Sequence, residues 1–249
     1  MQMLSSEKLL EIWEAGLSHR PLNRAIEVLR TAGVGPRDPA TLPLGVRDRY
    51  LLALREATFG SEINGIAHCP ECGEPVEMQF TAAEIKLPAV DAPETLVLDC
   101  GGYAVRFHLP TSEDLLGLEL SGELAGELAG AEEEDDLRVL ERCVSEVSRD
   151  GQPITAAELP AEVRIAVAET MAASDPQAQV EIALECPACH KGWLEMFDIE
   201  SFFWNELQAW AVRMLREIHQ LASAYGWSQR EILALSPLRR SVYLNLITE

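Results

Sequence analysis

The sequence is poor in basic residues. It has 20 lysine and arginine residues against 41 aspartate and glutamate residues, which gives a formal net charge of -21. A surface with this charge repels phosphate backbones and anionic lipid headgroups. The composition therefore disfavours general nucleic-acid binding and membrane-surface binding, and it favours solubility and contacts with basic proteins.

Long apolar runs are also missing. No uninterrupted apolar stretch approaches the ~20 residues that cross a bilayer. The chain begins MQMLSSEKLLEIWEAGL, which has the pattern of an amphipathic helix and lacks the charged start and apolar run of a signal peptide. We therefore expect a cytoplasmic protein without membrane insertion. In a reducing compartment, closely spaced cysteine pairs bind metal or do redox chemistry more often than they form disulfides.

The sequence lacks the common catalytic motifs. There is no HExxH, GxSxG, P-loop or GxGxxG pattern. The acidic run at 132–136 could suggest cation binding, but a run of like charges is more often a solvated loop. We therefore expect no enzymatic activity and no catalytic residues.

Against these absences stand two matched cysteine knuckles, more than a hundred residues apart. They read Cys-Pro-Glu-Cys at 69–72 and Cys-Pro-Ala-Cys at 186–189. Each lies between two expected strands, and a glycine follows soon after each. Four thiolates are the full ligand set of a closed tetrahedral zinc site. We predict one structural Zn²⁺ held by Cys69, Cys72, Cys186 and Cys189, which would join the first third of the chain to the last third.

Other interpretations of the knuckles remain open. They could be two independent reduced turns, or a site that has lost its metal. Redox catalysis is disfavoured because neither motif opens an evident helix, where a reactive thiolate would be stabilised. His68 and His190 flank the knuckles, and either could replace a cysteine as ligand or lie beside the ligands. Cys143 lies in a helical pattern and is expected to be a buried apolar residue.

The remaining patterns predict a helix-rich α+β protein with a split four-Cys zinc ribbon and a few short antiparallel strands. Helices are expected over 5–32, 45–58, 136–148, 156–173 and about 200–225, with short ones after Thr111, Ser228 and Pro237. Strands are expected over 63–67, 76–80, 95–99, 103–109, 178–185 and 192–197.

The same patterns divide the chain into four segments. Residues 1–60 form N-terminal helices, and 61–110 hold the first zinc knuckle and strands. Residues 111–177 form a helical insertion with an acidic Gly/Ala/Glu loop at 121–136. Residues 178–249 hold the second knuckle and C-terminal helices, and a shared metal would make all four segments one stapled unit. Arg239 and Arg240 form a small basic spot near the end, a candidate partner contact.

The C-terminal half resembles a known family. The matching pieces are FHLPTSEDLL at 107–116, Arg142-Cys143, Asp175-Pro176, FDI at 197–199, FFW at 202–204, YGWS at 225–228, LSP at 235–237, Arg239-Arg240 and Tyr243. Over about residues 45–249 the chain is similar to a zinc-knuckle protein encoded in contractile phage-tail-like gene clusters, which build extracellular contractile injection systems. It resembles T4-type phage baseplate proteins more distantly.

The resemblance implies a structural or assembly role, as a baseplate component or an assembly chaperone, without enzymatic activity. Its partners would be other baseplate or tail proteins, and the protein would act in the cytoplasm or be built into a particle. The four knuckle cysteines are the only site that it carries over. One departure is His190, which stands where a glycine is common. The rival hypothesis is a nucleic-acid-binding or transcription-related zinc ribbon, which the net charge disfavours.

Overall fold

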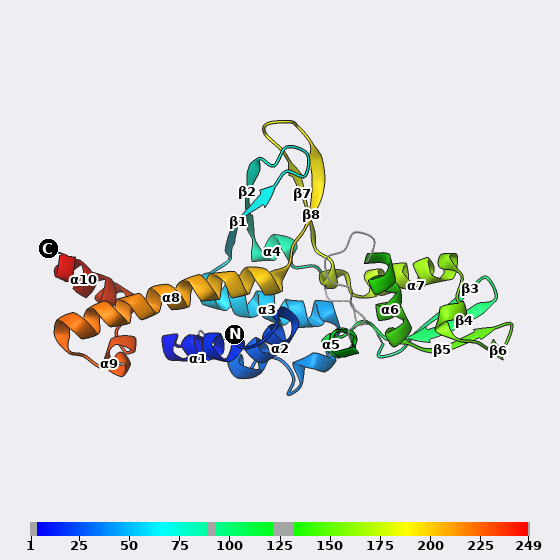
Figure 1. The fold of residues 1–249 in the computed structure, drawn as a ribbon, viewed down its shortest axis with the longest axis horizontal. Coiled ribbons are helices and arrows are strands. Elements are labelled where there is room, and N and C mark those ends of the chain that lie inside the picture. Colours follow the sequence, from blue (N-terminus) through cyan, green and yellow to red (C-terminus); the bar gives the residue numbers. More distant parts are fainter. Residues whose placement is uncertain (1–3, 89–92, 122–131, 249) are drawn as a thin grey trace.

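Three helices begin the chain in the computed structural model, which describes residues 4–88, 93–121 and 132–248 (Figure 1). They are α1 (Ser6–Gly16), α2 (Pro21–Ala32) and α3 (Leu44–Phe59), with a short 3-10 turn η1 (Pro39–Thr41) before α3. The Ser5 hydroxyl accepts a hydrogen bond from the Lys8 N–H and caps α1. The helical region expected over 5–32 is thus two helices, because Pro21 starts α2 afresh.

A 27-residue helix, α8 (Ile199–Tyr225), forms the long axis of the molecule. The Asp198 carboxylate caps its first turn, and Gly226 ends it in the left-handed conformation at φ 67°. The helix expected over about 200–225 is confirmed, and its buried residues, which include Phe203, Leu207 and Leu221, form one apolar stripe. Two short helices follow, α9 (Gln229–Leu233) and α10 (Pro237–Thr248). No helix in the described ranges is long and apolar enough to span a membrane.

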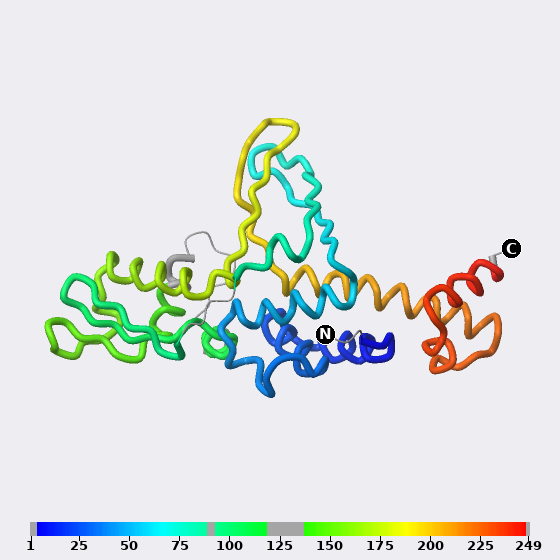
Figure 2. Tube along the Cα trace, turned by 180° about the vertical axis from the view of Figure 1, so that it is seen from behind, coloured from blue at the N-terminus to red at the C-terminus, as the bar shows by residue number. Residues whose placement is uncertain are grey.

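Two antiparallel hairpins project together from the middle of the molecule, as Figures 1 and 2 show from opposite sides. The first pairs β1 (Glu62–His68) with β2 (Pro75–Thr81), and a short helix α4 (Ala82–Ile85) follows it. The second pairs β7 (Glu181–Glu185) with β8 (Gly192–Met196). Each hairpin carries one of the predicted knuckles at its turn, and the strands predicted around both knuckles are confirmed.

The segment between the hairpins builds a separate lobe. Its sheet has the order β3 (Leu96–Cys100), β4 (Tyr103–Phe107), β5 (Val144–Arg149), β6 (Gln152–Pro153). The helices of this segment are α5 (Ser112–Ser121), α6 (Glu132–Cys143) and α7 (Ala161–Ser174), and its 3-10 turns are η2 (Ala156–Glu158) and η3 (Pro176–Ala178). The strands expected over 95–99 and 103–109 are confirmed as β3 and β4, which pair as a hairpin across Gly101-Gly102.

Three expectations for this lobe were wrong. The helix expected over 136–148 ends at Cys143, and Val144–Arg149 is strand β5, because it pairs with β4 across the sheet. Helix α6 begins at Glu132, so the acidic run is helical rather than part of a loop. Helix α7 begins only at Ala161, because 156–158 form the separate 3-10 turn η2 and the extended residue Pro160 caps the new helix. The rest of the predicted loop 121–136, from 122 to 131, lies outside the described residues.

Buried apolar residues form three clusters. The central cluster joins α1, α2, α3 and the first half of α8, and the second fills the lobe between its sheet, α6 and α7. The third lies at the far end of α8 against α9 and α10, around Leu221 and Ile232. The predicted fold class is therefore confirmed as helix-rich α+β with short antiparallel sheets. The division into four segments stays a prediction.

A buried polar network lies where the lobe meets the central body. The Arg47 guanidinium on α3 binds the Asp48 carboxylate at 2.7 Å, donates to the Ser112 hydroxyl at 3.0 Å and lies 3.6 Å from the Glu200 carboxylate. Next to it, the Gly45 N–H donates to the Asp175 carboxylate at 2.7 Å. Arg47 thus pairs with two carboxylates, those of Asp48 and Glu200. Glu200 Oε1 is buried without a hydrogen-bond partner among the described residues.

This network makes stability depend on pH. Burial raises the pKa of Glu200 from 4.5 to about 8 against the opposing effect of Arg47, and Asp198 and Asp48 add to the increase. The folded chain therefore keeps a proton that the unfolded chain loses, so stability should fall as pH rises from about 4.5 to about 8. We expect Glu200→Gln to be more stable than the wild type at pH 8.5 and similar at pH 5, measured by urea unfolding.

The matched control is Glu169→Gln, which changes an exposed glutamate on α7. It should shift stability equally at both pH values. An unchanged pH dependence in Glu200→Gln would show that Glu200 does not carry the effect.

Candidate metal centre

The two knuckles have the same backbone turn. In the first, the Cys69 N–H donates to the Glu74 carbonyl at 2.9 Å, and the Gly73 N–H donates to the Cys69 carbonyl at 2.8 Å. In the second, the Cys186 N–H donates to the Lys191 carbonyl and the His190 N–H to the Cys186 carbonyl, both at 2.9 Å. Each turn brings its two cysteines to the same side at the end of its hairpin.

The four knuckle sulfurs come together in one group. The Cys69 and Cys189 sulfurs are 3.6 Å apart, as are those of Cys72 and Cys186, and all four lie within 4.8 Å of one another. All are free thiols rather than disulfides. A tetrahedral zinc ion with sulfur ligands at about 2.3 Å needs sulfur atoms about 3.8 Å apart. The donor set and its spacing therefore fit a tetrahedral, thiolate-preferring metal ion.

The protonation of the sulfurs also favours a bound cation. Burial raises the pKa of Cys69, but the N–H groups of Cys72 and Glu71 outweigh it and lower that pKa to about 7. The Glu74 N–H lowers the pKa of Cys72, but the neighbouring sulfurs and burial outweigh this and raise it to about 12. The lowered pKa of Cys69 and the raised pKa of Cys72 mean that these two sulfurs do not ionise together without a cation. A divalent ion supplies the charge that lets all four ionise.

The two flanking histidines lie outside the group. His68 is exposed, and the exposed His190 has its Nδ1 3.5 Å from the Glu185 carboxylate. Among the described residues, the metal-binding group at the knuckles holds only the four cysteines. His190 takes the left-handed conformation at φ 58°, the counterpart of Gly73 at φ 74°. It therefore replaces a glycine of the turn, at a backbone position where a side chain is unfavourable.

Cys143 is separate from this group. Cys143 is fully buried in the lobe, as predicted, and burial raises its pKa to about 12. Its sulfur lies near His108 and Asp114. However, His108 Nδ1 hydrogen-bonds the Leu109 carbonyl, and the Asp114 carboxylate accepts from Thr111 at the start of α5. The polar atoms of His108 and Asp114 are thus engaged in hydrogen bonds within their own segment.

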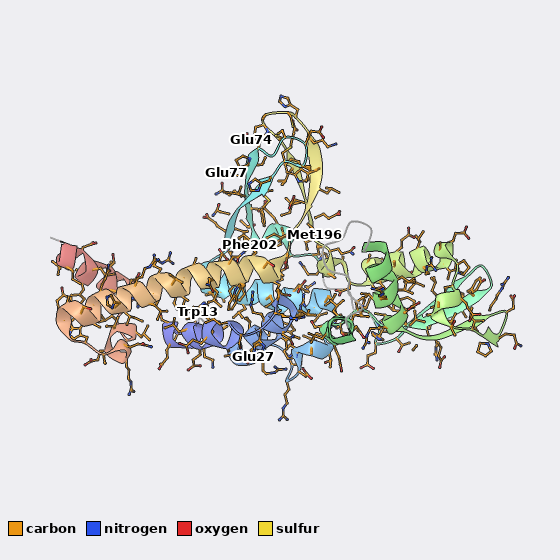
Figure 3. The ribbon with its side chains drawn as sticks, in the orientation of Figure 1. Trp13, Glu27, Glu74, Glu77, Met196 and Phe202 are labelled. Carbon is orange, nitrogen blue, oxygen red and sulfur yellow. The ribbon has the colours of Figure 1, made fainter. Side chains whose placement is uncertain are left out.

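Aromatic residues fix the hairpins to the body. At the foot of the hairpin pair, Phe197 contacts Phe80 and Phe202 with ring centroids 5.4 Å apart in both cases, and Figure 3 shows Phe202 where α8 meets the hairpins. Beneath them, Arg55 on α3 donates to the Glu206 carboxylate at 2.7 Å and to the Gly60 and Glu62 carbonyls. Nothing in the local sequence around Arg55 indicates this role, so it could not be predicted from the sequence.

The fold and the site define a class: a helix-rich protein in which two hairpins from distant parts of the chain bring four cysteines into one group. A family model described as "T4 bacteriophage base plate protein" matches residues 3–204, about four fifths of the chain. The protein belongs to this T4-type baseplate family. Comparisons with curated proteins and with solved structures gave no significant match.

The match has a different extent from the resemblance seen in the sequence. It includes the N-terminal helices, which looked less distinctive, and it ends at Trp204, six residues into α8. The pieces at 225–228 and 235–243 that suggested the family lie beyond it. Both knuckles and the whole lobe lie within it. The membership implies a phage baseplate-type structural role and contacts with other baseplate or tail proteins.

Proposed function

We propose that the protein is a non-enzymatic structural or assembly component of the baseplate of a contractile phage-tail-like particle. Family membership over residues 3–204 is the observation that carries this proposal. The protein would be made in the cytoplasm and would act through protein–protein contacts. The comparison supports the baseplate role, and the contractile injection system is the particle type that we propose for it.

The proposed cofactor is one structural Zn²⁺, held by the four knuckle cysteines. A four-thiolate site is coordinatively closed, so such a metal stabilises the fold rather than activating water. The ion would fix the hairpin pair as one rigid projection and would hold the two ends of the inserted lobe together. The all-sulfur donor set favours zinc over oxygen-preferring cations such as Mg²⁺ and Ca²⁺.

The charges on the hairpins disfavour a nucleic-acid-binding ribbon. The first hairpin, residues 62–81, has four glutamates and no lysine or arginine, and the second, residues 181–196, has three glutamates and one lysine. Zinc ribbons that bind nucleic acid need basic residues near the phosphates. We therefore propose that neither hairpin contacts DNA or RNA.

The test is the composition of the particles. In the producing cell, deletion of the gene should abolish intact sheathed particles, and expression of the chain from a plasmid should restore them. A built-in component would appear in purified particles at a fixed stoichiometry, whereas an assembly factor would be missing from them. Normal particles that lack the protein, made by the deletion strain, would overturn the proposal.

A further inference from the structure

The last helix presents an uncovered apolar stripe. Leu238, Val242 and Leu246 on α10 are exposed to 75%, 50% and 55%. They recur every four residues, so they lie on one side of the helix. The opposite side packs against α8 through Tyr243 and Leu244. A monomer leaves this stripe in water, which marks an interaction surface.

The same region is basic in an otherwise acidic protein. Residues 207–248, which we call the C-terminal arm, contain five arginines and two glutamates. Arg240 is buried in an ion pair with Glu217 at 3.2 Å, so it is not the surface contact that the sequence suggested. Four arginines of the arm are exposed: Arg213, Arg216, Arg230 and Arg239. At about 100° per residue, Arg239 borders the apolar stripe on the side of Leu246.

The exposed surface of the hairpin pair is acidic and partly apolar, so it is complementary to the basic arm. Its exposed residues include six glutamates: Glu62, Glu71, Glu74, Glu77, Glu181 and Glu185. Figure 3 labels two of them, Glu74 and Glu77, on the first hairpin. Between these charges, Ile66 and Leu194 are exposed to 63% and 61%. Ile66 pairs across the strands with Glu77, and Leu194 with Ala183, so each lies on the outward face of its hairpin.

From these two surfaces we propose that the hairpin pair of one copy docks on the C-terminal arm of a second copy. Apolar residues bordered by glutamates would meet an apolar stripe bordered by Arg239 in a basic arm, and such complementarity selects partners and orients them. The hairpins and the apolar stripe of α10 cannot meet within one chain, because Figures 1 and 2 show the hairpins at the middle of the molecule and α10 at its end. The inference is independent of the baseplate role proposed above.

The geometry of this contact sets the form of the assembly. Two different surfaces meet, so a pair of bound copies keeps one free hairpin pair, on one copy, and one free arm, on the other. Such a heterologous contact closes into a ring when the rotation between copies allows it, and otherwise it grows as a filament. Pairing of α10 with α10 would instead stop at a dimer.

The test uses the purified full chain and two surface variants. The arm variant carries Leu238→Glu and Val242→Glu, and the hairpin variant carries Ile66→Glu and Leu194→Glu. Sedimentation equilibrium should show the 27.5-kDa wild type associating as its concentration rises. We expect association at least ten times weaker in each variant alone, and also ten times weaker for the wild type in 0.5 M salt. Ile165→Glu, at an exposed position on α7, is the control and should associate as the wild type does.

Mixing the two variants gives the decisive result. The intact hairpins of the arm variant should bind the intact arm of the hairpin variant, forming a 1:1 dimer that grows no further. A hairpin variant that associates like the wild type would overturn the proposal in favour of pairing between arms. A wild type that stays monomeric at 100 times the concentration used for the variants would overturn it altogether, while the particle test above would be unaffected. Thermal unfolding and metal content of each variant confirm that its fold is intact.

Discussion

Replacing Cys69 or Cys186 by serine is expected to remove the same metal ion. The two residues lie on different hairpins, but their sulfurs belong to one group. Loss of a thiolate ligand should weaken zinc binding by more than about 100-fold. Mutation of residues that only hydrogen-bond to metal ligands typically weakens binding by roughly 10–100-fold. Because metal binding contributes directly to folding, each variant should also unfold several degrees lower. Zinc per chain, measured after dialysis against a chelator that leaves the wild type loaded, should fall from one to near zero.

Cys100→Ser is the matched control, because Cys100 is a half-buried cysteine at the turn of the lobe sheet. It should keep one zinc per chain under the same dialysis. Retention of the metal by either Cys69→Ser or Cys186→Ser would mean that the knuckles do not share a site. Loss of metal without a change in thermal stability would mean that the ion does not clamp the hairpins.

Replacing Arg55 by methionine is expected to destabilise the central body by about 3 kcal/mol, the lower end of the effect of breaking a buried ion pair, because the Glu206 side chain is 28% exposed. Arg55 is only 2% exposed. Its loss leaves the Glu206 carboxylate and the carbonyls of Gly60 and Glu62 without their donor. Urea unfolding followed by tryptophan fluorescence measures the change, because Trp204 and Trp210 lie in or against the central cluster.

Two further variants distinguish the contribution of the Arg55–Glu206 ion pair to stability from that of side-chain packing. The double variant Arg55→Met with Glu206→Leu should be less destabilised than the sum of the two single changes, because no charge is left without its partner. Arg30→Met removes an exposed pair with Glu27 on α2 and should change stability by less than about 1 kcal/mol. Equal effects of Arg55→Met and Arg30→Met would contradict the assigned role of Arg55.

The knuckles could be predicted because their signal is local. Cysteine spacing, proline and flanking strands all lie within about ten residues, and matched contexts were enough to pair segments 114 to 120 residues apart. Arg55 and Glu206 are 151 residues apart and carry no such pattern. Strand β5 was also missed, because it depends on pairing with β4 rather than on the helical pattern that runs into it. Tertiary contacts decided both cases.

The position of His190 shows a different limit of prediction from sequence. Its sequence context left a role as metal ligand open, because a histidine beside a knuckle can bind through either ring nitrogen. The structure gives the residue a turn position that Gly73 holds in the other knuckle. Two knuckles with matched backbones can therefore differ in this side chain while the same four cysteines cluster, and only the backbone conformation reveals this.

The separation of the two hairpins along the chain also determines when the four cysteines can come together. At a synthesis rate of about 5–20 residues per second, the second knuckle leaves the ribosome roughly 6–24 seconds after the first. Until then Cys69 and Cys72 would supply only half of the proposed ligand set. A chain that ends before Cys189 never completes the set. If the proposed zinc site forms, tightly held zinc would therefore distinguish chains that include both knuckles from shorter ones before any particle is built.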